Sequence, residues 1–180
     1  YYAWCEDERL YECKAKGGFR KAGIKPLVGD NVRMRVLDQH KCLGNIEEVL
    51  PRTNALIRPA VANVDQAMVV FSMANPVPNL NLLDRFLLMM EWQGVETVIC
   101  FSKQDIVSTE DEQKYKQIYA KCSNRVLTIS NTEKNGIEEV RKCLCGKTTV
   151  LAGPSGVGKS SLVNLIYPEA QSQTGEISEK

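Results

Sequence analysis

The sequence predicts a small all-β barrel over residues 1–65, followed by an α/β domain with a mostly parallel sheet over residues 66–180. Three observations support this fold class. Short strands separated by turn residues fill the first third of the chain, and strands alternate with helical segments in the rest. A glycine-rich loop stands between the last predicted strand and the last predicted helix.

The first domain has three segments with the length and turn boundaries of strands. They are expected at residues 11–15, 31–37 and 44–50, with glycine or proline near their ends. Residues 14–35 also hold seven basic side chains against one acid, Asp30, which gives a local charge of +6. Such a surface could follow a phosphate backbone, but a solvated loop with excess lysine explains the composition equally well.

In the second domain, apolar strands and helical segments alternate four times. Strands are expected at 67–73, 95–101, 125–129 and 148–152, and helices at 80–92, 109–121, 136–144 and 160–166. This alternation favours a mostly parallel sheet covered by helices on both faces. In the first helix, Leu80, Leu83, Leu87 and Met90 recur at helical spacing, which indicates a face that packs in the core.

The composition excludes several classes of protein. The 180 residues are 43% hydrophobic with a formal net charge of +1, unlike a wholly basic nucleic-acid coat or an acidic disordered tail. The longest clean apolar run, 86–90, is far shorter than the roughly 20 residues of a membrane span. Seven cysteines form no CxxC pair and His40 is the only histidine. We therefore expect reduced thiols in a cytoplasmic monomer without a membrane partner.

The glycine-rich loop matches the pattern G-x-x-x-x-G-K-[ST] between a predicted strand and a predicted helix. Its glycines allow backbone N–H groups to turn inward around phosphates. Lys159 is expected to reach the β- and γ-phosphates, and the Ser160 hydroxyl to ligate Mg²⁺. The nucleotide-binding residues expected in this segment are Gly153, Pro154, Ser155, Gly156, Val157, Gly158, Lys159, Ser160 and Ser161, with Lys159 and Ser160 in catalytic roles.

Two further segments follow predicted strands and are candidates for reading the base. The sequence Ser102-Lys103-Gln104-Asp105 resembles the NKxD guanine motif, with Ser in place of Asn. The Asp105 carboxylate can accept from both N1–H and the 2-amino group of guanine, which adenine cannot offer, and the Lys103 stem can lie on the base. The segment 128–131 then supplies Ser130 and Asn131. A helix cap by Ser102 is the structural alternative.

The order of these motifs is unusual, because the base-reading segments precede the phosphate loop by about fifty positions. That order resembles the circularly permuted GTPases. The basic β-rich domain in front narrows the resemblance to the ribosome small-subunit-dependent GTPase A (RsgA) family. Supporting segments are Gly29-Asp30 with Val32, residues 58–66, residues 153–161 and residues 174–178.

The RsgA resemblance covers essentially the whole chain and implies a function. It implies an OB-fold barrel, a permuted GTPase domain, GTP or GDP with Mg²⁺ as ligands, and late maturation of the small ribosomal subunit, which stimulates GTP hydrolysis. The barrel would bind rRNA through basic residues. Those expected to contact rRNA are Lys14, Lys16, Arg20, Lys21 and Arg33.

The sequence departs from the family in two places. Ser102 has less reach than the usual Asn toward the phosphate loop, so nucleotide affinity is expected to be lower and Ser102→Asn to leave it equal or tighter. Family members also continue past Lys180 into switch segments and a Zn²⁺-binding domain, so this chain is expected to be incomplete after its last helix. It should then bind nucleotide weakly and hydrolyse it negligibly, with residues 174–180 mobile.

Two other functions fit part of the sequence. Guanylate kinases have a similar phosphate loop, but they begin with it and need over a hundred residues after it, whereas about twenty follow here. A non-enzymatic RNA-binding module with a degenerate nucleotide domain would not need Lys159 and Ser160, both of which are intact. A permuted GTPase remains the preferred interpretation.

Overall fold

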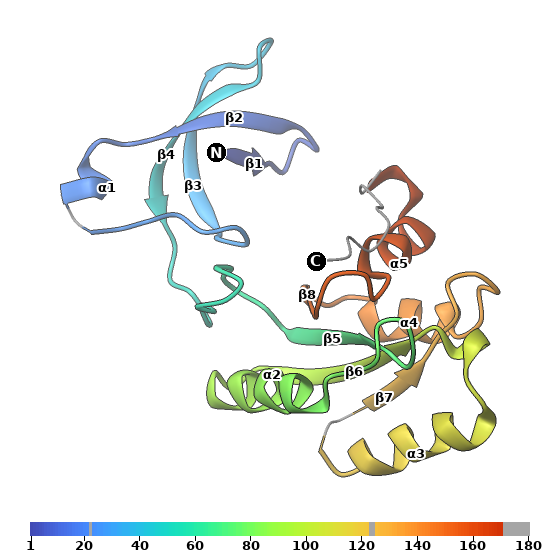
Figure 1. Cartoon of the computed structure of the whole chain (residues 1–180). Helices are drawn as coiled ribbons and strands as arrows, with labels where there is room; N and C mark the ends of the chain where they lie inside the picture. The colour runs from blue at the N-terminus through green and yellow to red at the C-terminus, as the bar shows by residue number, and fades with distance from the viewer. Residues whose placement is uncertain (22, 123–124, 171–180) are drawn as a thin grey trace. The chain divides into compact units, whose positions relative to one another are not determined.

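The computed structural model describes residues 1–21, 23–122 and 125–170. The chain divides into two compact units, Tyr1–Asn63 and Val64–Lys180, which are described separately here (Figure 1). Residues 174–178, which carried part of the family resemblance, and the predicted mobility of 174–180 lie outside the described residues.

The first unit is built on a four-stranded sheet in the order β1-β2-β4-β3. Strands β1 and β2 are antiparallel, β2 and β4 are parallel, and β3 and β4 are antiparallel with two register shifts. The bounds are β1 Tyr2–Trp4, β2 Leu10–Ala15, β3 Val32–Asp38 and β4 Leu43–Val49. The three strands predicted after residue 10 are therefore confirmed, and β1 is an additional strand.

Between β2 and β3, the turn residue Gly17 is followed by a short helix, α1 (Gly18–Lys21), which the sequence did not predict. The helix brings the Phe19 ring into the core of this unit, where Tyr11, Cys13 and Ile46 are also buried. Burial of an aromatic ring in a small core is a strong local stabilisation, and it outweighs the turn preference of the two glycines.

Asp30 holds the loop between α1 and β3 in place. Its carboxylate accepts from the Leu27 amide at 2.6 Å and from Arg52 Nε and Nη2 at 2.6 and 2.8 Å. Burial raises the pKa of Asp30, but the Arg52 and Leu27 hydrogen bonds outweigh burial and leave the pKa below its ordinary value. Gly29 precedes it at φ 86°, where a Cβ would overlap the Ala62 carbonyl oxygen. The Gly29-Asp30 pair thus has a structural role.

The second unit contains a fully parallel four-stranded sheet in the order β7-β6-β5-β8. Its helices connect successive strands, as the alternation predicted (Figure 1). The bounds are β5 Gln66–Ser72, α2 Leu80–Trp92, β6 Glu96–Ser102, η1 Gln104–Ile106, α3 Thr109–Tyr119, β7 Arg125–Thr128, α4 Ile137–Leu144, β8 Thr149–Ala152, α5 Lys159–Ile166 and η2 Pro168–Ala170.

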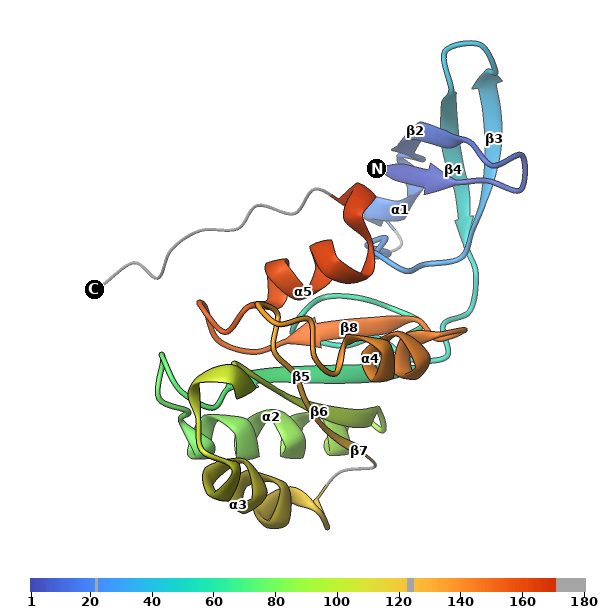
Figure 2. The same cartoon turned by 90° about the vertical axis from the view of Figure 1, so that its right-hand side faces the viewer.

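Helices cover both faces of this parallel sheet (Figure 2). On one face, Met68 and Val70 of β5 pack with residues of α4 and α5. On the other, Val69 and Phe71 pack with residues of α2 and α3. Every residue of β5 is buried, as expected for the central strand of a sheet that is covered on both sides. The helical spacing noted in 80–92 is core packing, since Leu83 and Met90 are fully buried.

Within the described residues, none of the helices has the length and apolar content needed to cross a membrane. All seven cysteines lie in the described part and are free thiols. Burial raises the pKa of the Cys100 thiol to about 12, so this thiol is chemically quiet at neutral pH. The described residues hold no cluster of three or more His, Cys, Asp or Glu side chains suited to a metal ion.

Candidate nucleotide-binding site

The phosphate loop, residues 153–160, runs from the end of β8 into the first turn of α5 at the carboxyl edge of the parallel sheet. Gly153, Gly156 and Gly158 all have positive φ, at 139°, 75° and 92°. A Cβ on Gly153 would overlap the Val70 carbonyl oxygen of the neighbouring strand. The loop therefore needs glycine both for its backbone conformation and for its approach to β5.

Lys159 is the first residue of α5, and its side chain folds back over the phosphate loop. The Nζ atom donates to the carbonyl oxygens of Gly153 and Pro154 at 3.0 and 2.5 Å. Burial lowers the pKa of this ammonium group from its ordinary value. Ser160 and Ser161 follow in the first turn of α5, where helical N–H groups have no partner within the helix. The loop thus gathers positive charge and N–H donors, which are features of an anion site.

The first base loop, residues 102–105, starts where β6 ends. Ser102 is fully buried, and its hydroxyl donates to the Val157 carbonyl of the phosphate loop at 2.6 Å. We expected a serine to have less reach toward the phosphate loop than the usual Asn, and the contact is nevertheless present. The hydroxyl reaches because β6 lies next to β5, and β5 pairs with β8, from which the phosphate loop begins. The helix-cap alternative is not observed, since Ser108 caps α3.

Lys103 and Asp105 complete the first base loop. Lys103 is in the left-handed region, at φ 63°, and its Nζ donates to the Asn75 carbonyl in the loop after β5. Asp105 lies in η1 with an exposed side chain. Its carboxylate is therefore accessible to a ligand beside the loop.

The second base loop, residues 128–131, also contacts the phosphate loop. Asn131 Nδ2 donates to the Gly158 carbonyl at 3.0 Å, and a Cβ on Gly158 would lie only 2.7 Å from that nitrogen. Asn131 Oδ1 is buried without a hydrogen-bond partner among the described residues. Ser130 is fully buried, and its Oγ accepts from the Glu133 amide at 3.0 Å. The two base loops thus bond to two consecutive carbonyls of the phosphate loop, the first base loop to that of Val157 and the second to that of Gly158.

One buried carboxylate at the site was not anticipated from the sequence. Glu112 of α3 accepts hydrogen bonds from Gln104 in the first base loop and from Thr128 in the second. The sequence could have identified Glu112, because its spacing places it on the same helical face as Tyr115 and Tyr119, which pack in the core. An acidic residue on an otherwise apolar face needs partners, and such a residue is a candidate for a structural or functional contact.

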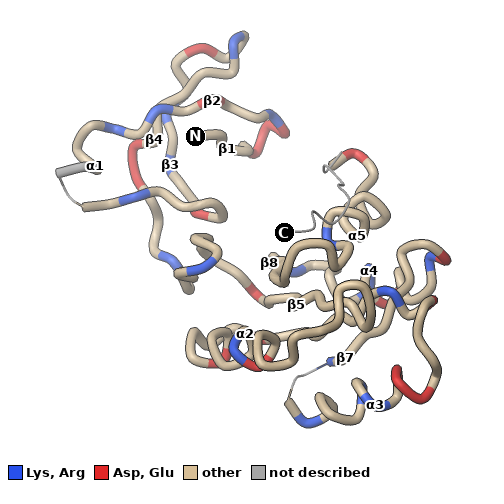
Figure 3. Tube along the Cα trace, viewed as in Figure 1, with Lys and Arg blue, Asp and Glu red and all other residues tan. Residues whose placement is uncertain are grey.

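The residues expected to bind RNA belong to more than one element of the first unit, and Figure 3 shows Lys and Arg at separate places along its trace. Lys14 and Lys16 are exposed and line a cavity of about 740 Å³ together with Lys25. Arg33 is exposed on β3 and forms an ion pair with Glu48 at 2.6 Å. Arg20 and Lys21 belong to α1, and their side chains lie outside the described part of the structure.

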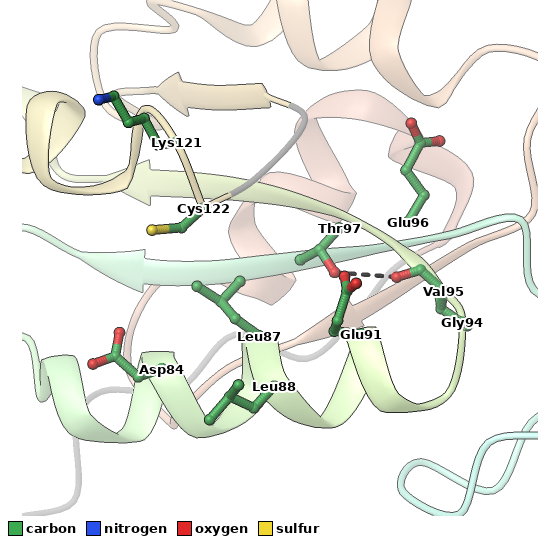
Figure 4. Close-up of a pocket in the computed structure, with 10 residues that line it drawn as sticks. All are labelled: Asp84, Leu87, Leu88, Glu91, Gly94, Val95, Glu96, Thr97, Lys121 and Cys122. Atoms are coloured by element: carbon green, nitrogen blue, oxygen red, sulfur yellow. Dashed lines mark hydrogen bonds between the residues drawn. The ribbon is translucent and has the colours of Figure 1, made fainter.

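A cavity of about 810 Å³ in the second unit lies away from the predicted site. Figure 4 shows it beside α2 and the start of β6, where the Thr97 hydroxyl donates to the Val95 carbonyl at 3.3 Å. The beginning of β6 is the amino edge of the sheet, opposite the phosphate loop. In open α/β sheets, ligands bind at the carboxyl edge, so this cavity is not part of the candidate nucleotide site.

Known proteins match both units. The family model described as RsgA GTPase matches residues 49–180, and the RsgA N-terminal domain matches residues 1–43. A curated relative from Agathobacter rectalis, named small ribosomal subunit biogenesis GTPase RsgA, is 51% identical over 190 residues, covering 100% of this chain and 63% of the relative. A relative of the same name from Alkaliphilus metalliredigens is 48% identical over 180 residues, covering 100% and 61%.

Two solved structures are similar to this chain. YjeQ from Thermotoga maritima has a TM-score of 0.79 at 37% identity, covering 91% of this chain and 59% of its own. YloQ, described as a circularly permuted GTPase, has a TM-score of 0.73 at 38% identity, covering 96% and 61%. The chain thus spans less than two thirds of the length of these relatives. The predicted fold class, an N-terminal OB-type domain before a permuted phosphate-loop domain, is confirmed, and the chain belongs to the RsgA GTPase family.

Proposed function

We propose that this chain binds GTP and GDP and belongs to a protein that hydrolyses GTP during maturation of the small ribosomal subunit. The observation that carries the proposal is the convergence of three loops at one edge of the sheet. Ser102 and Asn131, from the two base loops, hold the consecutive carbonyls of Val157 and Gly158 in the phosphate loop. A base and a phosphate chain of one nucleotide could therefore be held at the same time.

Each loop would have a separate task in nucleotide binding. When phosphate enters, Lys159 would exchange its bonds to the Gly153 and Pro154 carbonyls for bonds to the β- and γ-phosphates. The Ser160 hydroxyl, in the first turn of α5, would ligate Mg²⁺, which neutralises charge on the phosphates. Nucleotide contacts from the rest of residues 153–161 would come mainly from backbone N–H groups.

Guanine would be recognised by the two base loops. The exposed Asp105 carboxylate would accept from N1–H and the 2-amino group, and the Lys103 stem would lie along the base. Ser130 and Asn131 would close the other side of the base site. The unpartnered Asn131 Oδ1 supports this assignment, because a buried acceptor without a donor is costly until a ligand or water supplies one.

The partner would be the small ribosomal subunit, which the names of the curated relatives contain. Contact with rRNA would come from the first unit, through Lys14, Lys16, Arg20, Lys21 and Arg33. This proposed rRNA contact is supported by Lys14 and Lys16, which are exposed and line a cavity together with a third lysine, Lys25. We further propose a cytoplasmic monomer, and a Zn²⁺ site confined to the additional domain that the family resemblance implies.

Calorimetric titration of the chain with GDP and with ADP, each with Mg²⁺, tests the nucleotide assignment. The expected result is binding of GDP without comparable binding of ADP, and loss of GDP binding in Asp105→Ala. The matched control is Glu110→Ala, which removes an exposed carboxylate from the first turn of α3. Equal or tighter binding of ADP would contradict guanine recognition, and GMP-dependent ADP formation from ATP would indicate a kinase instead.

A further inference from the structure

Glu112 of α3 is a buried carboxylate to which the proposed nucleotide contacts assign no role. The residue is 8% exposed and accepts three side-chain hydrogen bonds. One comes from Lys116 Nζ at 2.5 Å within the same helix. Burial raises the pKa of Glu112, but the hydrogen bonds from Lys116, Gln104 and Thr128 outweigh burial and leave the pKa below its ordinary value. The carboxylate is therefore charged at neutral pH.

The other two donors lie at the two base loops, Gln104 as the first residue of η1 and Thr128 as the last residue of β7. Gln104 Nε2, from the residue directly before Asp105, donates to Glu112 Oε2 at 2.8 Å. Thr128 Oγ1, two residues before Ser130, donates to Glu112 Oε1 at 2.9 Å. The two carboxylate oxygens thus bond to separate segments, and a single side chain of α3 connects the two base loops.

The connection continues through Gln104 and Asn135. Gln104 Oε1 accepts from Asn135 Nδ2 at 2.8 Å, and the Asn135 carbonyl accepts from the Ser130 amide at 3.1 Å. The backbone N–H of Gln104 also donates to the Ile129 carbonyl at 3.0 Å. A continuous set of hydrogen bonds therefore links Glu112 to the residues flanking both Asp105 and Ser130.

We propose that Glu112 is the positioning residue that sets guanine selectivity, by holding the Asp105 loop and the Ser130 loop at a fixed separation. This inference rests on the proposed nucleotide function. The Asp105 carboxylate must meet two donors on the base edge at once, and such paired contacts depend on a preorganised loop. Without Glu112, the Gln104 side-chain amide loses its charged acceptor, and the loop samples positions in which Asp105 reaches only one of the two donors.

The test compares GDP with inosine diphosphate, which keeps the N1–H donor but lacks the 2-amino group. Dissociation constants for both nucleotides are measured by calorimetry with Mg²⁺ for the unmodified chain and for Glu112→Ala. In Glu112→Ala, GDP affinity is expected to fall about tenfold, which is roughly one charge-assisted hydrogen bond. Affinity for inosine diphosphate should change little. The selectivity ratio, which is the dissociation constant for inosine diphosphate divided by that for GDP, should therefore fall toward one.

Two controls separate positioning from a purely structural role. Lys116→Met removes the donor within α3 but leaves both base-loop bonds to Glu112, so the ratio should stay as in the unmodified chain. Gln104→Ala cuts the same connection from the loop side and should reduce the ratio as Glu112→Ala does, with the double variant no worse than either alone. Gln104→Ala also provides the test if Glu112→Ala does not fold.

Three results would overturn the inference. An unchanged ratio in folded Glu112→Ala, or in Gln104→Ala, would show that the loops hold their separation without Glu112. A ratio lowered equally by Lys116→Met would assign the effect to the stability of α3. If the unmodified chain failed to prefer GDP over ADP, the proposed nucleotide function would fail first, and this inference with it.

Discussion

The nucleotide loops of the second unit and the basic surface of the first unit differ in how their side chains are held. Ser102 is fully buried and Asn131 is half-buried, and each donates to a named carbonyl of the phosphate loop. Lys14 and Lys16 are exposed, and Arg33, also exposed, forms an ion pair with Glu48. Reading a base edge needs fixed donors and acceptors, whereas attraction to a phosphate backbone needs charge at roughly the right place.

The two units also differ in how much of their core is apolar and buried. In the second unit, β5 is buried along its whole length between two helical layers. In the first unit, the buried cluster on the sheet consists of Tyr11, Cys13, Phe19 and Ile46, and the charged pair Asp30–Arg52 holds the adjoining loop. Polar contacts therefore bear a larger part of the stability of the small unit, as expected where the apolar area is limited.

Lys159→Ala is expected to have the largest effect on the nucleotide site. The variant loses the charged donor for the β-phosphate, which is the terminal phosphate of GDP. GDP affinity should fall about 100-fold, which corresponds to about 3 kcal/mol, the upper end for one hydrogen bond between charged groups. Calorimetry measures this loss of affinity. The control variant is Lys142→Ala, which removes an exposed lysine of α4. Unchanged GDP affinity in Lys159→Ala would mean that residues 153–160 do not hold the phosphates.

Asp30→Ala is expected to destabilise the first unit by about 2 kcal/mol, because Arg52 and the Leu27 amide lose a charged acceptor. Urea unfolding monitored in each unit measures the effect, and GDP affinity should not change. Asp38→Ala, at the half-buried end of β3, is the control for removing a carboxylate that accepts from two backbone amides instead of from an arginine. A loss of GDP affinity together with stability would contradict the separate roles of the two units.

The same ion pair predicts a pH dependence. The pKa of Asp30 is lower in the folded chain than its ordinary value of 3.8, so its contribution is fully present at neutral pH. That contribution is lost as the pH falls below 3.8 toward the lowered folded pKa. Acid unfolding should therefore show a step in this range that Asp30→Asn removes. An identical acid transition in Asp30→Asn would assign the step to other carboxylates.

Charge reversal of Lys14 and Lys16 to Glu should have a smaller effect, restricted to the first unit. Affinity for isolated small ribosomal subunits is expected to fall about tenfold and to become less dependent on salt, because fewer phosphate contacts release counterions. GDP affinity should stay the same. Reversal of the exposed Lys114 and Lys142 in the second unit is the matched control. Equal losses in both double variants would reflect overall charge and not a surface of the first unit.

Sequence patterns predicted the second unit well, because its strands and helices have distinct apolar spacing and its phosphate loop has a fixed residue pattern. The strand predicted at 125–129 ends one residue earlier in the structure, at Thr128. Such boundaries depend on hydrogen bonds to neighbouring strands, which a single sequence does not contain. The first unit was harder, because β1 has three residues and α1 has four, too few for either periodicity.

The sequence named the candidate residues of the site but not the contacts that connect them. Asp105, Lys159 and Ser160 belong to linear motifs, so spacing alone identified them. The reach of Ser102 to Val157 depends on which strands are neighbours, and the order β6-β5-β8 is a tertiary property. Glu112 was missed because its partners Gln104 and Thr128 lie 8 and 16 residues away and belong to other elements.

The measurement that tests the central claim most directly is a comparison of GDP and xanthosine diphosphate binding to the unmodified chain and to Asp105→Asn. Xanthine has a 2-oxo group where guanine has a donating 2-amino group, and the asparagine amide can donate to that oxygen. If Asp105 reads the base, the unmodified chain will bind GDP and the variant will bind xanthosine diphosphate more tightly than GDP. If Asp105→Asn kept the original preference for GDP, the assignment of the first base loop as the guanine reader would be contradicted.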